Sequence, residues 1–105
     1  MAKSRTSGVV VKNGIDTTGL IFKRIPSSTK AKVENSKNIR QALRNGQTLV
    51  LRNDDTGNVE SYKLNRKDMT FTVTNRKETK TVSYEDGGNI WASWLLSKNR
   101  SYALR

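Results

Sequence analysis

The chain has 105 residues, with twenty lysines and arginines against nine acids, and a formal net charge of +11. It contains no cysteine and no histidine. This composition excludes disulfides, thiol chemistry and imidazole catalysis, and it leaves no ordinary ligand set for structural zinc. No apolar run approaches the roughly 20 residues that span a bilayer, and the basic start MAKSRTSG lacks the apolar segment of a secretory signal. We therefore expect a cytoplasmic protein with no metal, no cofactor and no membrane partner.

The positive charge is concentrated in the first half of the chain. Residues 1–52 carry eleven lysines and arginines against two acids, whereas residues 53–105 carry nine against seven. A surface that is charged only for solubility would more often mix its signs. The excess therefore predicts an anionic partner, and nucleic acid is the polyanion that fits it best.

The chain begins with basic and then β-branched residues. We expect residues 1–7 to form a flexible basic arm and residues 8–105 to form a single domain. The first strand is predicted in GVVVKNG, where the pair Asn13-Gly14 favours a tight turn, and the second in GLIFKRI, residues 19–25, before a proline. The polar stretch SSTKAKVENS that follows is predicted to be a loop.

The first helix is predicted at about residues 36–45. Asn35 or Ser36 would accept hydrogen bonds from the free N–H groups at its start, and Gly46 would end it in a left-handed conformation. Apolar residues with helical spacing place one side of this helix in the core: Ile39, Ala42 and Leu43.

Two hairpins are predicted next. The first has strands at about 47–52 and 58–64 around the turn DDTGN. The second has strands at about 69–75 and 79–84 around the basic tip NRK, and threonines alternate with apolar residues along it. Such a two-stranded ribbon can enter the major groove of DNA, but threonine is also favoured on the solvent-exposed face of any hairpin. We predict that this hydroxyl face mainly meets water and that the basic tip assists binding.

The chain ends in a second amphipathic segment. EDGG is expected to break the chain before a helix near residues 89–98, capped by Asn89, and the tail RSYALR carries no predicted element. Four apolar residues form one stripe along this helix: Ile90, Trp91, Trp94 and Leu95. The fold class is therefore α+β, an antiparallel sheet of about five or six strands covered by two helices, near 36–45 and 89–98. An alternative is that the sheet curls into a partly closed small barrel.

The candidate binding residues are the unbalanced cations of the first half. No basic residue of the predicted helix has an acidic partner within it, so its outer side could follow a phosphate backbone; the alternative is an ordinary solvated face. The predicted contacts to nucleic acid are Lys23, Arg24, Lys30, Lys32, Lys37, Arg40 and Arg44. Auxiliary contacts are predicted at Lys3, Arg5, Arg76 and Lys77. Tyr62 and Tyr102 remain candidates for stacking on unpaired bases.

These observations predict a small basic accessory protein, of a kind that suits a phage or a bacterium. It would bind DNA or RNA without catalysis, mainly through contacts of lysine and arginine with phosphates and with modest sequence preference. Two alternatives stay open. The basic face could dock on an acidic protein, as in an inhibitor or assembly factor. Arg100, Tyr102 and Arg105 could also serve a small ribonuclease that works without histidine.

Overall fold

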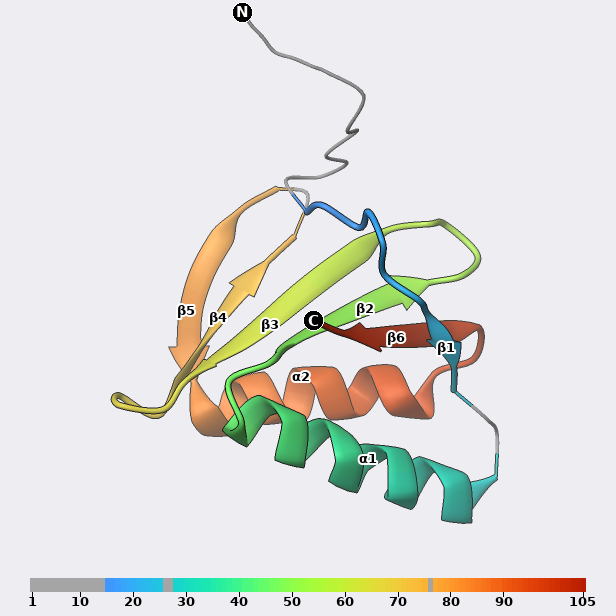
Figure 1. The fold of residues 1–105 in the computed structure, drawn as a ribbon, viewed down its shortest axis with the longest axis horizontal. Helices are drawn as coiled ribbons and strands as arrows, with labels where there is room; N and C mark the ends of the chain where they lie inside the picture. Colours follow the sequence, from blue (N-terminus) through green and yellow to red (C-terminus); the bar gives the residue numbers. More distant parts are fainter. Residues whose placement is uncertain (1–14, 26–27, 76) are drawn as a thin grey trace, which may run out of the picture.

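The computed structural model describes residues 15–25, 28–75 and 77–105. In these residues one six-stranded antiparallel sheet packs against two helices (Figure 1). The sheet is open, so the barrel alternative is wrong and the predicted α+β class is confirmed. The predicted basic arm, the predicted strand in GVVVKNG and the auxiliary residues Lys3, Arg5 and Arg76 lie outside the described residues.

The order of the strands differs from a simple meander at one edge. The strands are β1 (Lys23–Arg24), β2 (Thr48–Asn53), β3 (Val59–Asn65), β4 (Thr70–Thr74), β5 (Thr79–Ser83) and β6 (Arg100–Leu104), and the helices are α1 (Thr29–Arg44) and α2 (Tyr84–Leu96). Across the sheet they run β1-β6-β2-β3-β4-β5, and every neighbouring pair is antiparallel. The two predicted hairpins are confirmed as β2–β3 and β4–β5, while β6 inserts between β1 and β2.

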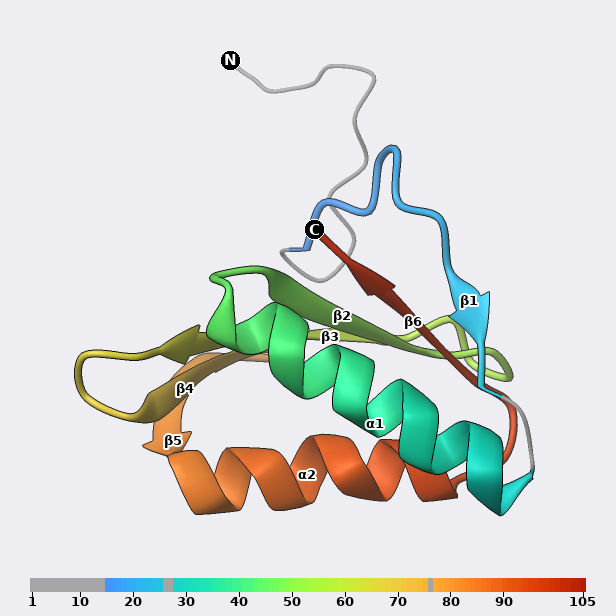
Figure 2. The same ribbon diagram turned by 60° about the horizontal axis from the view of Figure 1, so that its bottom comes forward.

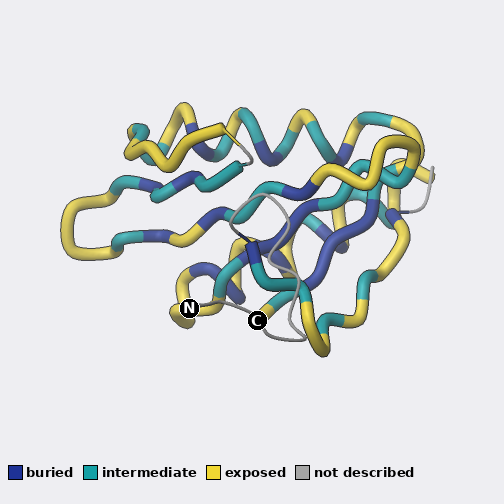
Figure 3. Tube along the Cα trace, turned by 90° about the horizontal axis from the view of Figure 1, so that it is seen from above, coloured by how far each residue is buried: buried dark blue, intermediate teal, exposed yellow. Residues whose placement is uncertain are grey.

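Both helices lie on the same face of the sheet, side by side (Figure 2). The core forms between them and the central strands, where Tyr62, Phe71 and Ile39 are almost completely buried. Figure 3 shows buried positions following these strands, with exposed residues in the connections. Phe71 meets the Tyr62 ring edge-on at 6.4 Å and stacks on the Tyr84 ring at 5.6 Å between centroids. The alternation of β4 thus buries its apolar side against α2.

The segment 15–22 covers part of the other face of the sheet, where its apolar residues pack against β2 and β3 (Figure 1). Ile15 is buried there with Val50 and Val59, and Phe22 packs beside them. The guanidinium of Arg52 lies 4.3 Å from the centre of the Phe22 ring. Elsewhere on this face, the threonines of β4 are partly exposed and those of β5 are exposed, in keeping with a hydroxyl face that meets water.

Helix α1 begins seven residues earlier than its apolar spacing predicts, at Thr29 rather than at residue 36. Its cap is Ser28, whose hydroxyl accepts a hydrogen bond from the Ala31 N–H at 3.2 Å. Asn35 lies inside the helix and is buried; it donates to the Ala31 carbonyl at 2.9 Å and accepts from the Tyr102 hydroxyl at 2.7 Å. The prediction of a loop in SSTKAKVENS was wrong. It was made because the first two turns of α1 contain few apolar residues and therefore show no helical apolar pattern. Gly46 follows the helix with φ +90°, as predicted.

The two candidate caps of α1 can be compared directly by mutation. Ser28→Ala is expected to lower the free energy of unfolding by about 1 kcal/mol, because it removes the acceptor for an N–H group at the helix start. Ser36→Ala, in the helix interior, is expected to be neutral or slightly stabilising, because alanine has the higher helix propensity. Urea unfolding of both variants measures the difference, and a larger loss for Ser36→Ala would contradict the earlier start.

Helix α2 also begins earlier than predicted, at Tyr84, and its cap is Ser83 rather than Asn89. EDGG does not break the chain but forms the first turns. Glu85 and Asp86 stabilise the helix start because carboxylates are favoured at the positive end of the helix dipole. Gly87 is buried against Phe71.

Strand β6 was not predicted at all. Its residues Ser101, Tyr102 and Ala103 are buried between β1 and β2. The alternation of polar and apolar residues in RSYALR is too short to separate a central strand from a tail. Its place in the sheet depends on pairing with two strands that are distant in the sequence.

Candidate nucleic-acid interface

Helix α1 holds four of the predicted cations on one side. Lys30, Lys37, Arg40 and Arg44 recur at intervals of seven, three and four residues, with Val33 between the first two, so the helical repeat brings them into one stripe. All four are exposed. At roughly 1.5 Å of rise per residue, the stripe runs about 21 Å along the helix axis.

Three neighbouring hollows connect this stripe with the edge of the sheet. The first, of about 410 Å³, lies between α1 and α2 and is lined by Lys32, Lys37 and Arg40 among others. The second, of about 520 Å³, shares Lys37 and Arg40 with the first and adds Arg44. The third, of about 630 Å³, shares Lys32 with the first and adds Arg24 at the edge strand β1. We call these five residues, Arg24, Lys32, Lys37, Arg40 and Arg44, the cationic band.

Few carboxylates lie near the cationic band. Glu34 of α1 is exposed one turn before Lys37, but it lines none of the three hollows. No carboxylate lines the three hollows among the residues that the structure describes. Both described ion pairs lie elsewhere, in Arg52–Asp54 and Lys80–Glu78. Glu85 approaches from α2, where it lines a further hollow together with Arg40 and Arg44. The band therefore keeps an excess of positive charge on a connected surface.

Three band residues are held in place by the rest of the fold. Lys32 donates from Nζ to the Leu95 carbonyl at 2.5 Å, so its cation sits at the negative end of α2. Arg24 donates from Nη2 to Asn99 Oδ1 at 3.0 Å. The Arg40 guanidinium lies 5.7 Å from the centre of the Trp91 ring. These contacts reduce the freedom that the side chains would lose on binding a ligand.

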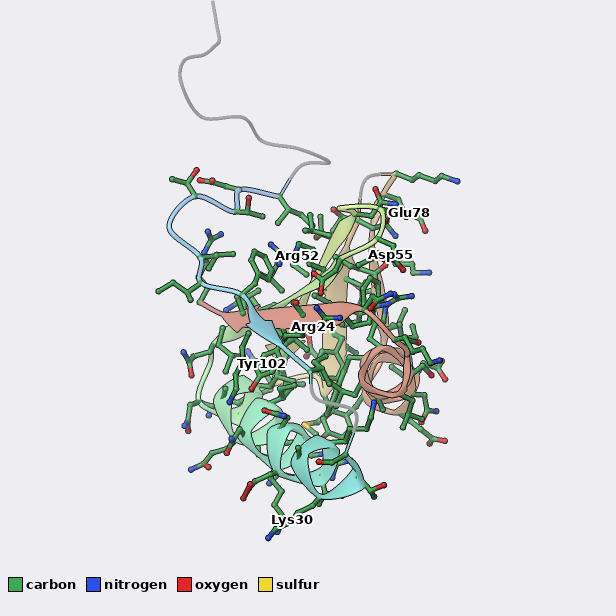
Figure 4. All side chains as sticks on the ribbon, turned by 90° about the vertical axis from the view of Figure 1, so that its right-hand side faces the viewer. Arg24, Lys30, Arg52, Asp55, Glu78 and Tyr102 are labelled. Carbon is green, nitrogen blue, oxygen red and sulfur yellow. The ribbon has the colours of Figure 1, made fainter. Side chains whose placement is uncertain are left out.

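Not every predicted cation joins the band. Lys30 belongs to the α1 stripe but lines none of the three hollows, and Figure 4 shows it pointing away from the sheet. Lys23 is exposed on β1, opposite Tyr102 in the strand register, and also lines none of them. Lys77 lines a separate hollow next to the β4–β5 turn. Lys98, which the sequence did not single out, lines the third hollow because the end of α2 carries it to β1.

The prediction that Tyr62 and Tyr102 could stack on bases was wrong. Their exposed fractions are 0% and 5%. The Tyr62 hydroxyl donates to Glu60, and the Tyr102 hydroxyl donates to Asn35 at 2.7 Å. Burial raises the pKa of both tyrosines, and the adjacent Glu60 carboxylate raises the pKa of Tyr62 further.

Two of the three residues proposed for a ribonuclease, Arg100 and Tyr102, have partners within the fold, whereas Arg105 is exposed. The Tyr102 hydroxyl is enclosed, and the Arg100 guanidinium lies 4.9 Å from the centre of the Trp94 ring and donates to the Lys98 carbonyl at 2.7 Å. In the described part of the chain, no group of three acids is placed to hold a metal ion, and neither helix is long and apolar enough to span a membrane.

Comparison of the chain with protein-family models, with curated proteins and with solved structures finds no match.

Proposed function

We propose that this protein binds nucleic acid, without catalysis, through the cationic band. The observation that carries the proposal is the connection of five cations from β1 and α1 through shared hollows that no described carboxylate lines. Lysine and arginine side chains on such a surface neutralise phosphates and release condensed counterions, which gives affinity with little dependence on sequence.

The shape of the charged surface favours nucleic acid over an acidic protein. The α1 stripe places cations at repeated intervals along about 21 Å, and a nucleic-acid strand presents its charges at regular intervals too. An acidic protein remains the alternative partner, because complementary charge alone also guides proteins together. The two are separated by recovery of the protein's partners before and after nuclease treatment, since only a protein partner survives.

The double variant Arg40→Gln/Arg44→Gln tests the proposal. The slope of log affinity against log salt should become less steep by about 1.8 for duplex DNA, because about 0.9 is lost with each phosphate contact. A fluorescence-anisotropy titration of a labelled duplex at several salt concentrations measures the slope.

The matched control for that test is Lys67→Gln/Lys80→Gln. It removes the same charge from two exposed residues that line none of the three hollows. Its slope should stay close to that of the parent protein. Equal flattening in both double variants would show that net charge, rather than the cationic band, drives binding, and an unchanged slope in Arg40→Gln/Arg44→Gln would remove α1 from the interface.

A further inference from the structure

Among the described residues, the hollow between α1 and α2 has the most apolar lining of the three hollows along the cationic band. Ala92, Leu95 and Leu96 of α2 face Val33 of α1 across it and form its apolar floor. Val33 is 52% exposed and Leu96 is 75% exposed, although both are large apolar side chains. Single exposed apolar side chains are ordinary, but two that line the same groove form a small apolar patch that can contact an apolar ligand.

The rim of this groove has a different chemistry from its floor. Lys32, Lys37 and Arg40 surround the apolar residues, and the hydroxyls of Thr29 and Ser36 lie among them. A ligand that fits must therefore combine a flat or apolar body with adjacent negative charge and polar edges. An unpaired nucleotide has this combination, since its base has an apolar face, its edges form hydrogen bonds, and a phosphate flanks it on each side.

Duplex and single-stranded nucleic acid differ in what they offer to this groove. A duplex keeps its base faces stacked inside and presents phosphates and sugars, so the apolar floor would stay uncovered. A single strand can turn a base outward and keep its phosphates beside it. The complementarity of charge at the rim and of apolar surface at the floor therefore favours a single strand.

The size of the groove argues against an acidic helix as its occupant. Its volume of about 410 Å³ falls in the range of small-ligand sites. From Thr29 to Arg40 the α1 wall is about 16.5 Å long, at roughly 1.5 Å per residue. A docked helix would need a far larger surface, since stable protein interfaces bury about 800 Å² on each partner.

We propose that the α1–α2 groove receives an unpaired base of single-stranded nucleic acid, while Lys32, Lys37 and Arg40 hold the flanking phosphates. This inference rests on the proposed function and specifies the form of its ligand. Thr29 and Ser36 supply hydroxyls that can bond either donors or acceptors on the base edge. Because the groove reads an apolar face rather than a fixed hydrogen-bond pattern, discrimination among bases is expected to be modest.

The test compares three labelled probes of equal length on the full chain: a single strand of thymidines, the same strand with abasic sites, and a duplex. The abasic strand keeps the phosphates and lacks the bases. It should bind on the order of tenfold more weakly than the thymidine strand, with the same salt slope, because stacking and apolar contacts are lost and phosphate contacts are not.

The double variant Val33→Ser/Leu96→Ser should reduce this tenfold preference to about twofold or less without changing the salt slope. Both positions are exposed, so the fold should tolerate the change. Ile21→Ser is the matched control, since Ile21 is 89% exposed and does not line the groove, and it should keep the full preference.

The outcomes separate this inference from the proposed function. Equal affinity for the abasic and thymidine strands, tighter binding of the duplex, or a preference that survives Val33→Ser/Leu96→Ser would overturn the base site while leaving phosphate binding in place. Failure of all three probes to bind at low salt would overturn the proposed function, and the base site would fall with it.

Discussion

Gly87→Ala is expected to lower the free energy of unfolding by about 2 kcal/mol. A Cβ atom at this position would lie within 2.9 Å of three Phe71 atoms, including its Cβ, which no side-chain rotation can move away. Overpacking of this kind typically costs roughly 1–3 kcal/mol, and the rigid contact places the cost at about 3 kcal/mol. The gain of about 1 kcal/mol in helix propensity offsets part of that cost.

The neighbouring glycine provides the control for this prediction. A Cβ atom at Gly88 would meet only the Trp91 Nε1 atom, at 4.0 Å, which is an ordinary contact. Gly88→Ala is therefore expected to raise the free energy of unfolding by up to about 1 kcal/mol. Urea unfolding followed by tryptophan fluorescence should show opposite signs for the two variants. Equal effects at both glycines would contradict the close packing of α2 on β4.

Alkaline pH is expected to destabilise the fold through Tyr62 and Tyr102. Burial raises the pKa of each hydroxyl above its ordinary value, and Glu60 adds to the shift at Tyr62. Below pH about 10 both tyrosines are protonated in the folded and unfolded chains, so they leave the pH dependence unchanged. Above it, the unfolded chain loses these protons first. The free energy of unfolding should then fall by about 1.4 kcal/mol per pH unit for each tyrosine, until the folded pKa is reached.

Phenylalanine variants isolate this effect. Tyr102→Phe should remove one of the two contributions to the slope above pH about 10, and Tyr62→Phe should remove the other. Tyr102→Phe should also lower stability at neutral pH by about 1–3 kcal/mol, because Asn35 Oδ1 would lose its buried donor. Unfolding curves in urea at pH values from about 9 to about 11.5 measure both quantities. If both variants kept the full parental slope, the alkaline loss would have to come from other groups.

The sheet could be predicted largely from local patterns. Alternation of apolar and polar residues located β2 through β5, and the Gly-containing turn between β2 and β3 joined the first pair. In the second hairpin, Phe71 and Val73 are buried while the threonines between them are partly exposed, as the period of two requires. The central part of α1 was predicted for the same reason, because Ile39, Ala42 and Leu43 repeat with the period of a helix.

The ends of the elements could not be predicted in the same way. The first turns of α1 and α2 are polar, and their stability comes from caps at Ser28 and Ser83 and from contacts with distant strands. Asn35 was misread as a cap because its partner, Tyr102, is 67 residues away in the sequence. EDGG was misread as a break because glycine is normally unfavourable inside a helix. At Gly87 glycine is required instead, because Phe71 leaves no room for a side chain.

Three properties of this protein follow from the sequence without the fold. It carries a strong positive excess in its first half, it contains no histidine or cysteine, and its strands and helices follow from alternating and helical patterns of apolar residues. The net charge and the spacing of apolar residues depend only on residues that are close in the sequence, so they can be determined without the fold. The fold was needed to show that Arg24 of β1 lines a hollow with Lys32 of α1, that Lys98 lines the same hollow, and that Tyr62 and Tyr102 are enclosed. These facts depend on contacts between segments far apart in the chain, which no local pattern encodes.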